Sequence, residues 1–374
     1  MKKYIININI ERWLLLSNAK DIGVLYLIFA LFSALFLEVI IQYIADNLFS
    51  NSVIAHDDLE FNSVIDFLQL LSLMPIITPI KLNPNYITGF TDAEGCFHIS
   101  IVDKARSVTG SDVRARFQIT LHSKDKELLE KIKNTFEVGK ILNRGDNVYY
   151  YQVSNVKDLG VIINHFDKYP LLTQKRVDFE QFKLVVEKMI NKEHLTSNGL
   201  KEIISIKQTI KSLKESYRGK GMDMSIERPL VESSSLDPFW LLGFVEGEGC
   251  FFVNVHKKSS HRLGEAVKLV LKITQDSREN EILTSLERYL GCGSNYKQST
   301  SGTVKDFIVT KFSDITDKII PFFDKYPLLG SKRKDFEDFK KVAELMKNKA
   351  HLTREGLLLI KEIKKGMNSG RESN

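Results

Sequence analysis

Two glutamates, Glu94 and Glu248, hold equivalent positions in a nine-residue motif that the chain contains twice. The motif reads GFTDAEGCF from Gly89 and GFVEGEGCF from Gly243, 154 residues further along. Each glutamate stands at the end of an expected helix, where the negative end of the helix dipole disfavours a carboxylate. Because this unfavourable placement occurs twice, it indicates a function. Two nearby carboxylates repel each other unless a cation lies between them. Oxygen ligands of this kind suit Mg²⁺, which activates water for hydrolysis.

Each motif is expected to lie in a short helix, over Asn83–Gly95 and over Asp237–Gly249. Both segments begin with an N-cap residue followed by proline and reach a glycine that suits a helix end. Small residues recur four positions apart on one stripe of each helix: Gly89 and Ala93, and Gly243 and Gly247. We therefore expect the two helices to pack closely and to bring the two glutamates together.

Each motif contains a second acid, Asp92 or Glu246, two residues before the first. Helix geometry places this acid about 200° around the axis from the glutamate. We expect Asp92 and Glu246 to be structural and to form hydrogen bonds near the helix ends.

The repetition extends over most of the chain. Phe166–Leu172 returns as Phe323–Leu329, now 157 residues later, so the second copy holds three extra residues, which we expect in a hairpin loop. A repeat of this length is too long for a solenoid unit and indicates two similar domains. The expected divisions are a leader at 1–81, a first repeat at 82–210, a linker at 211–235 and a second repeat at 236–370.

Strands of period two follow each motif. In Val113–Leu121 and in Val267–Ile273, apolar residues alternate with basic and polar ones, so one sheet face is buried and the other polar. A merely solvated face is one interpretation, but the polar positions carry Arg, Lys, Gln, Asn and Tyr and nearly lack acids. Such side chains pair with phosphates and base edges, and a two-stranded ribbon fits the major groove. The expected DNA-binding residues are His98, Ser100, Lys104, Arg106, Arg114, Arg116, Gln118, Thr120, Lys140, Arg144, Tyr150, Gln152, Asn254, His256, Lys258, Lys268, Lys272, Thr274, Lys297 and Lys311.

Amphipathic helices are expected after the second strand of each repeat, at Lys124–Phe136 and Arg278–Leu290. Further helices are expected behind the sheet at Asp178–Ile190 and Asp335–Met346. Each repeat therefore has the order helix, two strands, helix, two strands, helices. This order predicts an α+β fold in which helices cover one face of an antiparallel sheet.

The composition agrees with a nucleic-acid-binding protein without establishing one. The chain has 374 residues and a formal net charge of +6, a mild bias toward polyanionic partners. Its three cysteines lack metal-ligand spacing. They therefore indicate neither a disulfide framework nor a zinc site, and a reduced compartment is expected.

The leader contains a nearly continuous apolar run at Val24–Ile44, just long enough to span a membrane. Glu38 and Gln42 interrupt this run, so we do not expect the leader to contact a membrane. Asn18–Ser33 resembles the start of cytochrome c oxidase subunit 1. This resemblance implies an intron reading frame fused to an upstream exon of a mitochondrial gene.

The duplicated motif, the Tyr169–Leu172 segment followed by Lys175-Arg176, and His194–Thr196 resemble the LAGLIDADG homing endonucleases of fungal mitochondrial introns. The resemblance is to the single-chain, two-repeat type and covers roughly Leu82–Met367. It implies two pseudo-symmetric αββαββα repeats packed through the motif helices. It also implies a monomer in the mitochondrial matrix that grips a long, asymmetric double-stranded DNA site. With Mg²⁺, such an enzyme cleaves both strands and leaves 3′ overhangs.

The same resemblance implies roles for particular residues. The implied metal ligands are Glu94, Glu248 and the backbone carbonyls of Ala93 and Gly247. Gln275 falls at the position of a water-organising residue, and its repeat partner is Leu121, which implies chemically unequal half-sites. Lys297 and Lys311 are the candidate basic groups near the scissile phosphates.

An RNA maturase that helps its host group I intron to fold is the alternative function that the resemblance implies. Both functions need the basic sheet face, whereas only DNA cleavage needs both motif glutamates. Glu94 and Glu248 are both present, which favours the endonuclease.

Overall fold

The structure, a computed structural model, describes residues 81–216, 236–297 and 304–371. These described residues belong to a single unit by their internal contacts. The leader up to residue 80, with its apolar run and its oxidase-like stretch, lies outside the described residues, as does most of the linker. Within the described ranges, no helix combines the length and the apolar content needed to cross a membrane.

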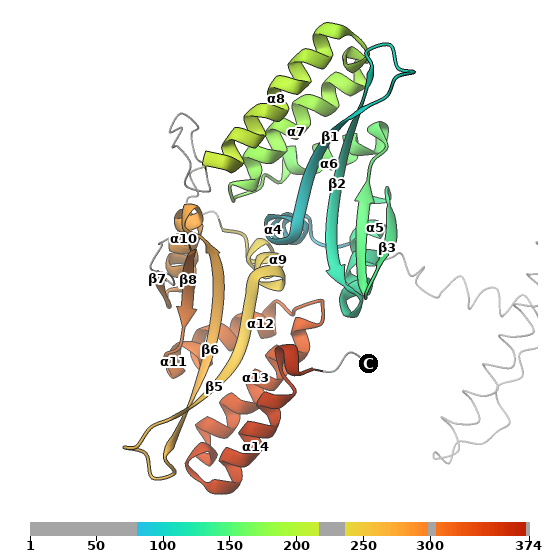
Figure 1. Ribbon diagram of the computed structural model, residues 1–374. Coiled ribbons are helices and arrows are strands. Elements are labelled where there is room, and N and C mark those ends of the chain that lie inside the picture. Colours follow the sequence, from blue (N-terminus) through green and yellow to red (C-terminus); the bar gives the residue numbers. More distant parts are fainter. Residues whose placement is uncertain (1–80, 217–235, 298–303, 372–374) are drawn as a thin grey trace, which may run out of the picture. The chain divides into compact units, whose positions relative to one another are not determined.

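The first repeat has the expected order of helix, two strands, helix, two strands and helices (Figure 1). Its elements are α4 (Pro84–Glu94), β1 (Gly95–Asp103), β2 (Ser111–His122), the 3₁₀ turn η1 (Ser123–Asp125), α5 (Lys126–Phe136), β3 (Lys140–Gly145), β4 (Val148–Val153), α6 (Val156–Lys168), α7 (Lys175–Ile190), the turn η2 (Glu193–Leu195) and α8 (Ser197–Ser216). The strands form an antiparallel sheet in the order β1-β2-β4-β3.

The second repeat follows the same plan. Its elements are α9 (Pro238–Glu248), β5 (Gly249–Lys257), β6 (Glu265–Asp276), the 3₁₀ turn η4 (Ser277–Glu279), α10 (Asn280–Leu290), β7 (Ser294–Lys297), β8 (Val304–Val309), α11 (Phe312–Asp314), the π-helix η5 (Ile315–Ile319), α12 (Ile320–Lys325), α13 (Lys332–Lys347), the turn η6 (Ala350–Leu352), α14 (Arg354–Lys365) and the turn η7 (Asn368–Gly370). The sheet order β5-β6-β8-β7 repeats that of the first half. The α+β class and the two αββαββα repeats are confirmed.

The three extra residues of the second repeat enter at two places. The strand pair Lys140–Gln152 corresponds to Ser294–Ile308. The spacing between equivalent residues is therefore 154 before the β7–β8 hairpin and 156 after it. The third extra residue enters the counterpart of α6, where η5 forms one π-helical turn. A π-helical turn adds a residue to a helix without ending it. The expected hairpin insertion therefore accounts for two of the three residues.

Aromatic side chains join each sheet to the helices that cover it. Phe97 of β1 packs against rings of α6 and α7, with centroid distances of 5.7, 5.4 and 5.3 Å to Phe166, Phe179 and Phe182. Phe251 of β5 makes the equivalent contacts, at 5.2, 5.2 and 5.5 Å, with Phe323, Phe336 and Phe339. All of these rings are buried. The apolar faces expected from the period-two strands therefore form the core, and large aromatic groups contribute most to its hydrophobic stabilisation.

Some helices have bounds other than those expected. The helices α7 and α13 begin three residues earlier than predicted, at Lys175 and Lys332. These two lysines therefore lie in the first turn of a helix. The helix α8 continues to Ser216, six residues into the segment 211–235 that was expected to be a linker.

His165 of α6 is expected to make the fold sensitive to acid. Its Nε2 lies 3.2 Å from Thr88 Oγ1, and its ring stands edge-on to Phe136 and Phe166. Burial lowers the pKa of His165 to about 4, whereas an unfolded histidine titrates near 6.5. The unfolded chain therefore binds the proton first. Stability should fall by up to roughly 3 kcal/mol as the pH drops from 6.5 to 4.

Urea unfolding between pH 7 and 4.5 measures this effect. His165→Gln keeps an N–H donor for Thr88 and cannot titrate, so it should lose less stability in acid than the wild type. Equal losses in the two proteins would contradict the prediction.

Candidate active site

The two motif helices, α4 and α9, are here called the signature helices. The Asn83 side chain accepts a hydrogen bond from the Asn85 N–H at 2.9 Å, and Asp237 accepts one from the Phe239 N–H at 2.8 Å. A capped start followed by proline sets the first residue of each helix. Both helices end at a motif glutamate, and the first strand of each repeat begins at the next residue. The expected helix limits are confirmed.

The signature helices lie side by side (Figure 1) and touch backbone to backbone. A Cβ added at Gly89 would come within 2.0 Å of the Trp240 carbonyl oxygen, and one at Gly243 within 2.1 Å of that of Tyr86. A Cβ at Gly247 would come within 2.3 Å of the Ala93 side chain. The expected stripe of small residues therefore allows the close approach of the two helices.

Glu94 and Glu248, here called the glutamate pair, are the last residues of the two helices. Both side chains are partly buried. Burial raises the pKa of Glu248, and repulsion from Glu94 raises it further. A hydrogen bond from the Gln275 side chain acts in the opposite direction, as do two nearby lysines. The two carboxylates are therefore close enough to interact, as expected from the sequence.

Two partly buried lysines, Lys175 of α7 and Lys332 of α13, reach the C-terminal ends of the signature helices. Lys175 Nζ donates to the carbonyl oxygens of Thr91 and Ala93, at 3.0 Å each. Lys332 Nζ donates to the carbonyl oxygens of Val245 and Gly247, at 3.0 and 2.9 Å. Burial lowers the pKa of both lysines, whereas neighbouring carboxylates, including the glutamate pair, oppose this shift. Their role was not predicted from the sequence. The only signal was a Lys-Arg dipeptide at equivalent positions of both repeats.

Asp92 and Glu246 are structural, as predicted. Asp92 accepts hydrogen bonds from the backbone N–H groups of Leu172 and Thr173, at 2.9 and 3.2 Å, and from Trp240 Nε1 at 2.8 Å. Glu246 accepts one from the Leu329 N–H at 2.6 Å. Each acid therefore holds the loop that leads into the lysine-bearing helix of its own repeat.

The groups at this joint fit a divalent cation. Two partly buried carboxylates that repel each other, together with the carbonyl oxygens of Ala93 and Gly247, form a set of oxygen donors of the kind that Mg²⁺ and Ca²⁺ bind. Within the described ranges, no three His, Cys, Asp or Glu side chains gather in a way that could hold a metal ion. The site on the protein therefore offers two carboxylates and two carbonyl oxygens, and leaves the other coordination positions for water or phosphate oxygens.

The two halves of the site are unequal. Gln275 contacts Glu248, whereas its repeat partner Leu121 lines a cavity of about 410 Å³ that also contains Glu94 and Lys332. An amide can orient a carboxylate or a water molecule, and a leucine cannot. The predicted inequality of the half-sites therefore has a structural basis.

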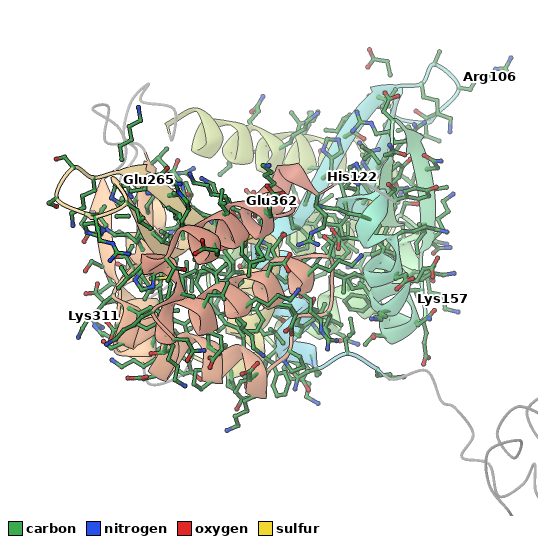
Figure 2. All side chains as sticks on the ribbon, turned by 90° about the horizontal axis from the view of Figure 1, so that it is seen from below. Arg106, His122, Lys157, Glu265, Lys311 and Glu362 are labelled. Atoms are coloured by element: carbon green, nitrogen blue, oxygen red, sulfur yellow. The ribbon has the colours of Figure 1, made fainter. Side chains whose placement is uncertain are left out.

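Lys311 is not brought to the glutamate pair. It is the N-cap residue of α11, and its side chain is 74 % exposed. Gln275 stands opposite Lys305 of β8, and Lys311 follows six residues later, roughly 20 Å along an extended chain. Figure 2 shows Lys311 at the periphery of the second repeat. Lys297 also stands opposite Lys305, nearer to Gln275, but its side chain is outside the described part of the chain.

The polar face of the first sheet gathers the expected DNA-binding residues into cross-strand rows. Residues that stand opposite each other are His98 and Arg116, Ser100 and Arg114, Gln118 and Gln152, Lys140 and Gln152, and Thr120 and Tyr150. Arg114 Nε also donates to Asp112 at 2.9 Å, and Gln118 Nε2 donates to Thr120 Oγ1 at 2.9 Å. These contacts orient polar side chains on one face.

The second sheet departs from the expected pattern at Asp306 of β8. Cross-strand neighbours on its polar face are Asn254 and Lys268, His256 and Ala266, and Thr274 and Asp306. Asp306 is buried, accepts a hydrogen bond from Thr274 Oγ1 at 2.6 Å and lies 3.9 Å from Lys272 Nζ. The expectation that this face nearly lacks acids therefore fails here. Thr274 and Lys272 have a partner within the sheet.

The hairpin ends carry the remaining basic residues. Lys104 and Arg106 lie in the β1–β2 turn, Lys258 in the β5–β6 turn and Arg144 near the end of β3, and all four are exposed. Figure 2 shows Arg106 at the tip of its hairpin. These side chains extend the basic surface beyond the sheet faces.

The fold and the site define a class of two-repeat protein. Its two signature helices pack together, each ends at a glutamate, and each repeat adds a sheet with one polar face. A model of the LAGLIDADG endonuclease family matches residues 87–186 and 241–343. The chain belongs to this family.

Two relatives from Neurospora crassa resemble the chain. "Probable intron-encoded endonuclease 2" is 40% identical over 304 residues, which cover 76% of this chain and 65% of the relative. "Probable intron-encoded endonuclease 3" is 37% identical over 288 residues, which cover 74% of this chain and 53% of the relative. The chain therefore spans less than two thirds of the length of either protein.

Solved structures of two-repeat family members are also similar. I-SmaMI bound to uncleaved DNA in the presence of calcium ions gives a TM-score of 0.71 at 40% identity and covers 77% of this chain and 99% of that one. The I-LtrWI LAGLIDADG homing endonuclease bound to target DNA gives a TM-score of 0.70 at 44% identity, covering 77% and 98%. Each match covers nearly the whole of the solved chain, so the likeness includes both repeats.

Proposed function

We propose that the chain is a site-specific endonuclease that acts in the homing of the intron that encodes it. It cuts both strands of a long, asymmetric DNA site by metal-assisted hydrolysis and leaves 3′ overhangs. One chain carries both repeats, so the enzyme works as a monomer. The observation that carries this proposal is the glutamate pair at the joined ends of the signature helices, flanked by two partly buried lysines.

Each residue of the site has a part in this proposal. Glu94 and Glu248, with the carbonyls of Ala93 and Gly247, hold divalent cations, Mg²⁺ in the cell. Bound Mg²⁺ supplies Lewis acidity toward the phosphate and lowers the pKa of water. The ammonium groups of Lys175 and Lys332 add positive charge beside the glutamate pair, where charge develops on the phosphate oxygens. Gln275 orients Glu248 in one half-site only, so the two strands are cut at different rates.

The polar sheet faces bind the DNA. Their Arg and Lys side chains contact phosphates and give an affinity that falls steeply with salt. Gln, Asn and Arg side chains at the cross-strand rows read base edges in the major groove. The named relatives are intron-encoded proteins of fungi, and another similar protein is described as mitochondrial. We place the chain in the mitochondrion, in the matrix, where its DNA target resides.

A cleavage assay tests the proposal. The substrate is a labelled duplex that spans the intron-free junction of the gene carrying this reading frame, with a scrambled duplex of the same composition as the control. Cleavage of both strands in Mg²⁺, with binding but no cleavage in Ca²⁺, is the expected result. Binding without cleavage in Mg²⁺ would overturn the endonuclease. The host intron RNA would then be the next substrate, because a maturase needs the basic face and not the glutamate pair.

A further inference from the structure

Two acids at helix starts do not cap their own helices. Asp125 is the N-cap residue of α5 and Glu279 that of α10, yet neither side chain forms a capping hydrogen bond there. An aspartate at the N-cap position ordinarily accepts from the N–H groups of the first turn. In both repeats this side chain points to another partner.

The partner belongs to the other repeat. Asp125 accepts hydrogen bonds from the backbone N–H of Ser331 at 2.5 Å and from its hydroxyl at 2.9 Å. Glu279 accepts one from the backbone N–H of Gln174 at 2.9 Å. Asp125 and Glu279 are 154 residues apart, and Gln174 and Ser331 are 157 apart, so each pair is equivalent in the repeat. The same bond is therefore made twice, once in each direction between the repeats.

The helices whose N-cap N–H groups donate these hydrogen bonds carry the lysines of the site. Gln174 and Ser331 are the N-cap residues of α7 and α13, and their own side chains form no capping hydrogen bond. A carboxylate at a helix N-terminus interacts favourably with the helix dipole. The next residues, Lys175 and Lys332, donate to carbonyls beside the glutamate pair. The placement of each lysine therefore depends on an acid of the opposite repeat.

The same loops are also held from their own repeat. A Cβ at Gly330 would lie 2.8 Å from Asp125 Oδ1 and 3.1 Å from Glu246 Oε1, so one carboxylate from each repeat flanks this loop. Asp92 of the first repeat and Glu279 of the second likewise accept hydrogen bonds from the loop at residues 172–174. The bonds from Asp125 and Glu279 link the start of each lysine-bearing helix directly to the opposite repeat.

We propose that Asp125 and Glu279 are positioning residues that act across the repeats, Asp125 for Lys332 and Glu279 for Lys175. As far as it concerns cleavage, this inference rests on the proposed function. Neither acid needs to touch DNA or metal. Each half-site is complete only when the opposite repeat is docked, which makes cutting by a misassembled half inefficient.

Strand-resolved cleavage tests the inference. Lys332→Met and Lys175→Met first identify the strand that depends on each lysine. Asp125→Ala should then slow cleavage of the strand that depends on Lys332, on the order of ten- to a hundredfold. Glu279→Ala should slow cleavage of the strand that depends on Lys175 by a similar factor. Glu279→Gln keeps an acceptor oxygen and should retain the wild-type rate. Glu127→Ala and Glu281→Ala, exposed acids in the first turns of the same helices, are the matched controls.

Hydrogen exchange without DNA gives a second readout that does not depend on cleavage. Asp125→Ala should speed exchange, by about tenfold, at the amides of Ser331, Arg333 and Lys334, which belong to the hydrogen-bonded first turn of α13. The equivalent first turn of α7 should be unchanged, and Glu279→Ala should give the reverse pattern.

The outcomes separate the inference from the proposed function. The positioning role would be overturned if faster hydrogen exchange were confined to α5 or α10, in the repeat that carries the mutation. It would also be overturned if Asp125→Ala slowed cleavage of both strands equally. A wild type that does not cut, with the reciprocal exchange pattern intact, would refute the nuclease and leave the positioning role standing.

Discussion

Replacing Glu94 or Glu248 by glutamine is expected to lower the rate of double-strand cleavage on the order of a thousandfold, with DNA affinity changed by no more than a few-fold. Glutamine keeps the shape of the side chain and removes the negative charge that a divalent cation needs. A thousandfold loss corresponds to about 4 kcal/mol of transition-state stabilisation, in the range that a metal ion supplies. The sheet faces proposed to bind DNA do not include either residue, so binding should persist.

Cleavage rates in Mg²⁺ and fluorescence anisotropy in Ca²⁺ measure the two effects separately. Glu127→Gln, an exposed acid on α5, serves as the charge-matched control and should cut normally. Undiminished cleavage by Glu94→Gln or Glu248→Gln would remove the glutamate pair from the mechanism. A loss of DNA binding equal to the loss of cleavage would point to misfolding instead.

Gly89→Ala is expected to destabilise the protein by about 3 kcal/mol or more. The added methyl group would stand 2.0 Å from the Trp240 carbonyl oxygen, and a backbone atom cannot turn aside as a side chain can. The signature helices must then separate, and the glutamate pair separates with them. Gly243→Ala should have the same effect, because its methyl group would stand 2.1 Å from the Tyr86 carbonyl oxygen.

Gly160→Ala is the matched control. Gly160 lies within α6, and nothing stands within 4 Å of a Cβ added there. Alanine at this position should stabilise the protein by about 0.5–1 kcal/mol, because it restricts the unfolded chain without a clash. Urea midpoints of the three variants and the wild type measure the difference. A Gly89→Ala protein as stable as the wild type would show that the helices have room to shift.

The elements of this protein were predictable because their signals are local. Asn83 or Asp237 followed by proline marks the start of each signature helix, and the alternation in Val113–Leu121 marks a strand with one buried face. The internal repeat then required the two motif helices to be equivalent. The small residues on one stripe of each helix then predicted that the two helices pack together and that Glu94 and Glu248 meet.

The second layer of the site was decided by tertiary structure. Lys175 and Ala93 are 82 residues apart in the chain, and Asp125 and Ser331 are 206 apart. No periodic pattern relates residues at such separations. The repeat did not settle the partner of Asp125. Its side chain could cap its own helix or accept a hydrogen bond from the other repeat, and the same sequence is compatible with both.

Local departures from the repeat were also invisible in the sequence. The buried Asp306, which binds Thr274 on a face expected to be nearly free of acids, takes this place through the register of β6 against β8. The extra residue in η5 gave no composition signal, since a π-helical turn needs no special residue. Neighbouring residues thus determine the helix starts, the strand faces and the positions of the paired acids. The lysines beside the acids, and the carboxylates that hold them from the opposite repeat, exist as a site only once packing brings distant segments together.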